Sequence, residues 1–146
     1  MNRKKIIAFD QDDTLNITKL PLNAKMANLL EALLIKYKVL IISGTNFEVM
    51  KKNNIDLLSS KHLDKLHIMP TNGTQYYKYE NGNWNRIYRY FLTKKQIERA
   101  SDLLKNGMKK FNFWIENPAG EIIENRQSQI TMSALGQWAK PEDKHK

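Results

Sequence analysis

The amino-acid sequence predicts an α/β fold in which a parallel β-sheet with flanking helices is followed by a second, α+β module. Strand-like and helix-like segments alternate over the first 70 residues, the pattern of parallel strands joined by crossover helices. In the second half, a hairpin pattern and a helix precede two short strands, which is typical of an antiparallel sheet. The length of 146 residues allows one ordinary domain or two small modules.

The first strand is expected at residues 5–9, an apolar run that stops abruptly at acidic residues and is therefore expected to be buried. Residues 10–22 are polar, include a proline and predict a loop. Asn23 is expected to be the N-cap of the first helix. The apolar residues of this helix recur at spacings of three and four, at Ala24, Ala27, Leu30 and Leu34.

The second strand is expected at residues 37–42, which are rich in Val and Ile. Asn46 is expected to cap a further helix. Residues 67–69 predict a short third strand, which ends at a proline. Because ligands bind at the carboxyl ends of the strands in such sheets, residues that directly follow these strands are candidates for a site.

The second half begins with two runs that flank Asn81-Gly82, a strong hairpin pattern, at residues 74–79 and 84–91. Thr93 and Gln96 then form a capping-box pattern before an amphipathic helix.

Two short strands are expected after this helix, at residues 121–124 and 129–133. We place the boundary between the modules within residues 72–82. The expected domains are therefore 1–80 and 81–146.

Composition narrows the class of protein. The net charge of +9 comes from lysines scattered along the chain and mixed with Asn and Ile, so it favours attraction of anionic small molecules over a dedicated nucleic-acid surface. No apolar run approaches the roughly 18–20 residues of a membrane helix. The chain has no cysteine, which excludes disulfides and thiolate metal sites. We expect a cytoplasmic protein with no membrane partner; the oligomeric state is not predicted.

Three carboxylates, of Asp10, Asp12 and Asp13, are crowded within four residues after the first strand. Two unit charges about 4 Å apart repel by roughly 4 kcal/mol at an effective dielectric constant near 20. A divalent cation removes this conflict, and oxygen ligands suit Mg²⁺. The pattern therefore predicts metal-assisted phosphoryl transfer, with one carboxylate as nucleophile and another moving protons. The alternative is an acidic, solvated turn that caps the next element.

The segment Phe9-Asp10-Gln11-Asp12-Asp13-Thr14-Leu15 resembles the first motif of the haloacid dehalogenase-like (HAD) superfamily of phosphatases and phosphomutases. Ser43, after Val39-Leu40-Ile41-Ile42, matches the second motif. The resemblance implies a Rossmann-like core, with Asp10 as nucleophile, Asp12 as general acid/base and both as Mg²⁺ ligands. It also implies that Thr14, Ser43 and Gly44 bind the phosphoryl group.

The second half resembles the α+β cap that phosphomannomutase-like and sugar-phosphate-phosphatase-like members insert after the second motif. The stretch 126–137 is similar to a cap segment of the mutases, and there Arg126 matches an arginine that grips the substrate phosphate. Gln137 departs from the mutases, which have a second arginine, and this argues against mutase activity. The alternative for Arg126 is a surface arginine paired with Glu124.

The superfamily's third motif, a Lys or Arg, and its fourth, a strand ending in acidic residues, are not found in the sequence. We therefore expect a core that is only partial: a truncated chain, a degenerate relative or a protein completed by a second polypeptide. The predicted function is a Mg²⁺-dependent phosphohydrolase that acts on a small phosphomonoester, a sugar phosphate, through an aspartyl phosphate. The alternatives are a phosphomannomutase-like phosphotransferase and a non-catalytic phosphate-binding relative.

Overall fold

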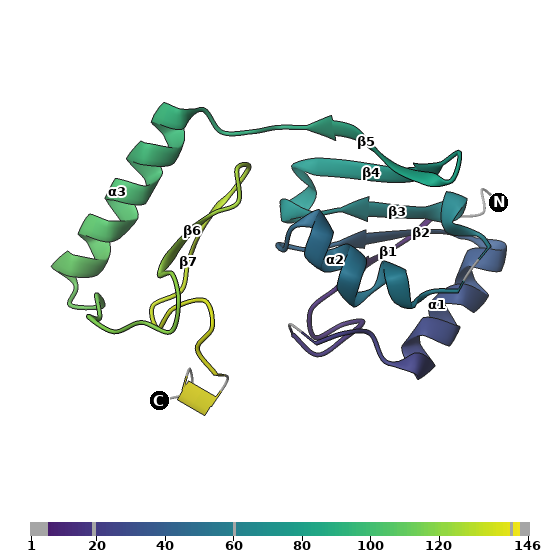
Figure 1. Ribbon diagram of the computed structural model, residues 1–146, viewed down its shortest axis with the longest axis horizontal. Coiled ribbons are helices and arrows are strands. Elements are labelled where there is room, and N and C mark those ends of the chain that lie inside the picture. The colour runs from purple at the N-terminus through teal and green to yellow at the C-terminus, as the bar shows by residue number, and fades with distance from the viewer. Residues whose placement is uncertain (1–5, 19, 60, 141, 144–146) are drawn as a thin grey trace, which may run out of the picture. The chain divides into compact units, whose positions relative to one another are not determined.

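The computed structural model describes residues 6–18, 20–59, 61–140 and 142–143, and the chain divides into two compact units, Met1–Tyr90 and Phe91–Lys146. The first unit contains one five-stranded sheet in the order β1-β2-β3-β4-β5 (Figure 1). Its strands are β1 (Ile6–Asp10), β2 (Lys38–Ile42), β3 (Leu66–Met69), β4 (Gln75–Glu80) and β5 (Asn83–Arg89). The first three strands are parallel, as predicted, whereas β4 and β5 pair antiparallel.

The helices of this unit begin where the sequence places their caps. The helix α1 (Ala24–Lys36) follows Asn23, whose side chain accepts a hydrogen bond from the Met26 N–H at 2.9 Å. The helix α2 (Phe47–Asn53) follows Asn46, which accepts from the Val49 N–H at the same distance. Short 3₁₀ helices occupy two connections, namely η1 (Ile55–Leu57) and η2 (Leu63–Lys65), and η3 (Thr71–Gly73) is a turn whose residues have positive φ.

One hydrophobic core lies between the sheet and these two helices. Alternate residues of β2 and β3 point into it, because successive strand residues face opposite sides of a sheet. The core residues from these strands and the helices are Ala27, Leu30, Leu34, Val39, Ile41, Met50, Leu66 and Ile68. Burial of each large aliphatic side chain contributes about 1.5–3 kcal/mol, so this cluster holds β2 and β3 against α1 and α2, and Phe9 of β1 packs against it.

The strand β1 differs from the buried strand that the sequence suggested. Its described residues alternate between exposed and half-buried, and Ile6 is 47% exposed. The reason is topological: β1 is the edge of the sheet and pairs with β2 alone among the described strands. Residue 5, which was expected to begin the strand, lies outside the described residues.

The hairpin extends the sheet of the first unit. Its first strand, β4, pairs with β3 through His67 opposite Lys78 and Ile68 opposite Tyr77. Along the chain, the boundary between the two compact units falls between Tyr90 and Phe91, which is later than the boundary expected within residues 72–82.

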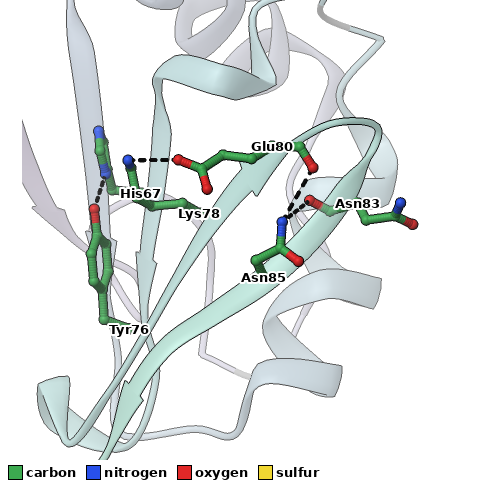
Figure 2. Close-up of polar contacts among 6 residues, drawn as sticks. All are labelled: His67, Tyr76, Lys78, Glu80, Asn83 and Asn85. Atoms are coloured by element: carbon green, nitrogen blue, oxygen red, sulfur yellow. Dashed lines mark hydrogen bonds and ion pairs between the residues drawn. The ribbon is translucent and has the colours of Figure 1, made fainter.

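A polar pair lies between β3 and β4 in this sheet. The His67 ring and the Tyr76 phenol point toward one another, with 2.5 Å between His67 Nδ1 and the Tyr76 hydroxyl (Figure 2). Burial lowers the pKa of His67 below its ordinary value of 6.5, and the charges of Lys38 and Lys78 lower that pKa further. His67 is thus a buried residue of the sheet whose ring is held by Tyr76.

The second unit contains the helix α3 (Lys94–Lys110) and a hairpin of β6 (Ile123–Asn125) and β7 (Ile130–Met132). The capping box predicted at Thr93 and Gln96 is present, with hydrogen bonds in both directions. No helix in the described part of the chain is long and apolar enough to cross a membrane.

Candidate functional site

The loop after β1 is organised around a buried side chain, Gln11, which is 1% exposed. Its carbonyl accepts hydrogen bonds from the Leu15 and Asn16 N–H groups at 2.9 and 3.2 Å, which closes the loop into a tight turn. Its side-chain Oε1 accepts a hydrogen bond from Asn54 Nδ2 at 2.8 Å, and Asn54 is also 1% exposed. Because Gln11 is held inside the protein, Asp10 and Asp12 on either side of it are left nearer the surface.

Asp13 is engaged within its own loop. Its carboxylate accepts hydrogen bonds from the Thr18 N–H at 3.0 Å and from the Thr18 hydroxyl at 2.8 Å. These bonds hold the pKa of the Asp13 carboxyl below its ordinary value of 3.8. Asp13 also has a left-handed backbone, with φ of 57°. The Asp13 carboxylate is therefore committed to its own loop, and Asp10 and Asp12 remain the carboxylates considered for the site.

The end of β2 lies beside this loop. Ser43 is 2% exposed, and its hydroxyl is 3.5 Å from Asp12 Oδ2, a long contact between residues 31 positions apart. The Thr45 N–H donates to Ser43 Oγ at 3.2 Å, and the Ser43 N–H donates to the Met69 carbonyl of β3. Asp12 and Ser43 therefore meet at the carboxyl edge of the parallel strands, where the sequence predicted a site.

Asp10 is exposed at the tip of β1, and its register partner on β2 is Ile42, the residue before Ser43. Thr14 is also exposed. It lines an apolar cavity of about 660 Å³ between β1 and α1, together with Phe9, Leu15 and Met26. Asp10 and Ser43 thus share one edge of the sheet, whereas Thr14 lies at the side of the loop that faces α1.

The turn that follows β3 also reaches this edge, and the sequence did not place it in the site. The Asn72 N–H donates to the Ser43 carbonyl at 2.9 Å, and the Thr71 N–H donates to the Thr45 carbonyl at 2.8 Å. The Asn72-Gly73 dipeptide, a turn pattern that favours a left-handed backbone, is the feature of the sequence that marks this position.

Arg126 belongs to the second unit. It forms an ion pair with Glu124, with 2.8 Å between Nη2 and Oε2, and both side chains are about three-quarters buried. This pair is the alternative that the sequence left open for Arg126. A role in gripping a phosphate stays a prediction.

A metal at this edge would depend on few protein ligands. Among the described residues, no group of three or more His, Cys, Asp and Glu side chains is arranged to hold a metal ion. Asp10 and Asp12 offer carboxylate and carbonyl oxygens at the loop. Mg²⁺ is often bound through one or two carboxylates, with substrate oxygens and water completing its shell. This donor set therefore fits Mg²⁺ better than a metal ion whose ligands all come from the protein.

No protein-family model matches the chain, and no curated protein matches it. Solved structures do match. An IMP-bound IMP-nucleotidase of Plasmodium falciparum superposes with a TM-score of 0.63 and 15% identity over 95% of this chain. A haloacid dehalogenase-like hydrolase of B. subtilis gives 0.54 and 20% over 75%, and the haloalkanoate-superfamily phosphatase BT1666 of Bacteroides thetaiotaomicron gives 0.50 and 17% over 74%.

The chain spans 43%, 34% and 36% of the lengths of these three proteins. The similarity between this chain and each of the three proteins is a similarity of fold.

Proposed function

We propose that this chain, which has the fold of the haloacid dehalogenase-like hydrolases, is a member of that superfamily and a Mg²⁺-dependent phosphohydrolase of small phosphomonoesters. One observation supports this most strongly. The carboxylate of Asp12 lies 3.5 Å from the hydroxyl of Ser43, beside the exposed Asp10, at the carboxyl edge of three parallel strands. The residues that would attack, protonate and bind a phosphoryl group thus come from two adjacent strand ends.

In the proposed reaction, the Asp10 carboxylate attacks phosphorus and the bond to the leaving oxygen breaks, which yields an aspartyl phosphate. Asp12 donates a proton to the leaving oxygen and then takes one from the water that hydrolyses the intermediate. The Ser43 hydroxyl and the Gly44 N–H would donate to phosphoryl oxygens. When bound by Asp10 and the Asp12 carbonyl, Mg²⁺ supplies charge neutralisation between carboxylate and phosphate.

The substrate class is a further proposal. A sugar phosphate follows from the cap resemblance, with Arg126 as a second phosphate contact if it leaves Glu124. Two of the solved neighbours are described as bound to IMP and to ATP, which adds nucleotides to the candidates. Gln137 in place of a second arginine disfavours the phosphomutase alternative.

Phosphate release from a panel of phosphomonoesters at millimolar Mg²⁺ tests the proposal. We expect slow turnover, because the third and fourth motifs are not found in the sequence. Asp10→Asn should abolish it. Asp13→Asn is the matched control, because this carboxylate of the same loop is bound to Thr18, and it should keep most of the activity.

A binding measurement accompanies the assay. Beryllofluoride with Mg²⁺ should raise the melting temperature of the unaltered chain and of Asp13→Asn but not of Asp10→Asn. Stabilisation of all three proteins alike, or turnover that survives Asp10→Asn, would count against the proposal. The non-catalytic alternative predicts neither turnover nor stabilisation by beryllofluoride, because only a competent Asp10 site should be stabilised.

A further inference from the structure

Three consecutive residues in the turn after β3 have a left-handed backbone. Thr71, Asn72 and Gly73 have φ values of 49°, 55° and 79°. Gly adopts this conformation freely and Asn adopts it often, but a β-branched residue such as Thr does so rarely. Residues in such regions cost on the order of 1–3 kcal/mol each and persist only where the surrounding structure holds them.

The surrounding structure that holds this turn is the Ser43 loop. The N–H groups of Thr71 and Asn72 donate to the carbonyls of Thr45 and Ser43. Thr71 is fully buried, and its hydroxyl lies 2.5 Å from that of Thr74. The next two N–H groups, of residues 73 and 74, also donate to carbonyls of the turn, so the turn is no anion-binding nest.

The turn instead presents the side chain of Asn72. Asn72 is exposed, although its backbone is bonded to Ser43. A Cβ atom placed on Gly44 would lie 3.5 Å from Asn72 Oδ1 and 3.9 Å from Nδ2. The carboxamide therefore lies against Gly44, directly beside the residues proposed to bind the phosphoryl group.

The order of the strands separates Asn72 from the nucleophile. Asp10 is on β1, Ser43 follows β2 and Asn72 follows β3, so Asp10 and Asn72 flank Ser43. Neighbouring strands are about 4.8 Å apart, which places the strand of Asn72 roughly 10 Å from that of Asp10. The leaving group departs on the side of phosphorus opposite the nucleophile, and Asp12, which would protonate it, is beside Ser43.

We infer that Asn72 is a specificity-determining residue, whose carboxamide forms hydrogen bonds with a hydroxyl or amide group of the substrate next to its phosphate. This inference rests on the proposed function and narrows it to phosphomonoesters with a polar, uncharged leaving group. A carboxamide has donors and an acceptor but no charge, so it suits such a group. The turn holds the backbone of Asn72 beside the Ser43 loop, so that its carboxamide lies next to Gly44.

Isothermal titration calorimetry with Mg²⁺ present tests the inference, because it needs no turnover. The probes are glucose 6-phosphate and IMP, which carry hydroxyl groups, and phenyl phosphate, which has an apolar leaving group. Asn72→Gly removes the carboxamide and tolerates the φ of 55°. Asn81→Gly is the matched control, because Asn81 is exposed with φ of 54° in the hairpin turn between β4 and β5.

Asn72→Gly should weaken the tighter of the two hydroxyl-bearing probes about threefold to tenfold, the value of one uncharged hydrogen bond, and leave phenyl phosphate unchanged. Asn81→Gly should change neither. Equal weakening of all probes, or none, would overturn the inference, as would unaltered protein that binds phenyl phosphate as tightly as the others. Unaltered protein that binds no probe would instead refute the proposed function.

Discussion

The hydrogen bond between Gln11 and Asn54 is expected to be a main support of the candidate site. Both side chains are 1% exposed and the bond is 2.8 Å long. Replacement of one partner by an apolar residue of similar shape leaves the other buried without its hydrogen bond, which costs about 1–3 kcal/mol. Gln11→Met should be the more damaging change. Asn54 Oδ1 has no hydrogen-bond partner among the described residues, so Asn54→Leu removes an uncompensated acceptor as well.

The double variant isolates the bond. With both polar groups gone, the free energy of unfolding should recover, and the coupling between the two sites should be about 1–3 kcal/mol. Each kcal/mol shifts the melting temperature of a domain of this size by about 4–8 °C, so Gln11→Met alone should lower it by at least about 4 °C.

Tryptophan fluorescence during urea and thermal unfolding measures this effect. Trp84 packs against Phe47 in the first unit, whereas Trp114 and Trp138 belong to the second. All variants are therefore made in a parent protein that carries Trp114→Phe and Trp138→Phe. In this parent, the remaining fluorescence of Trp84 reports on the first unit alone. A Gln11→Met variant that unfolds within about 0.5 kcal/mol of the parent, the range of neutral surface changes, would refute the reasoning. So would a double variant whose loss equals the sum of the two single losses.

Three further outcomes follow from the structure. Thr18→Val removes the hydroxyl that donates to Asp13 and should raise the pKa of Asp13 toward 3.8, measured by NMR titration; an unchanged pKa would contradict this side-chain hydrogen bond. His67 should make unfolding easier as pH falls below about 6.5, because the unfolded chain takes up a proton there that the folded chain accepts only at lower pH. His67→Gln should flatten this slope in melting temperatures measured from about pH 8 to about pH 5. Gly136→Ala should destabilise the second unit by at least about 2 kcal/mol, because the new Cβ would lie 2.4 Å from a backbone oxygen at φ of +92°. The control is Gly82→Ala, which has a φ of +80° and open space around it and should destabilise the first unit by only about 1 kcal/mol. Equal losses of stability for the two variants in urea unfolding would argue against a close backbone contact at Gly136.

Local patterns in the sequence were sufficient for the first half of the fold. The caps at Asn23 and Asn46 and the parallel strands that end near Asp10 and Ser43 follow from side-chain chemistry within a few residues. The strand with which a predicted strand pairs does not follow from such local patterns. The pattern of residues 74–91 shows a hairpin but not the edge to which it adds, and so the sequence assigned its second strand to the wrong side of the observed unit boundary.

The remaining parts of the site depend on contacts that are distant in sequence. A glutamine between two aspartates shows no sign of burial, because its partner Asn54 is 43 residues away. The left-handed conformation of Thr71 runs against the preference of a β-branched residue and exists because the Ser43 loop binds the turn. The exposure of β1 likewise depends on which strands lie beside it.

The central claim is that Asp10 accepts a phosphoryl group, and covalent trapping tests it most directly. The Asp12→Asn variant should slow hydrolysis of the intermediate, while p-nitrophenyl phosphate supplies a leaving group that needs little help from an acid. After incubation with this compound and Mg²⁺, borohydride reduction and mass spectrometry of the peptides should show reduction at position 10 and nowhere else. Phosphate on Ser43 or another residue, or no reduction at Asp10, would contradict the account.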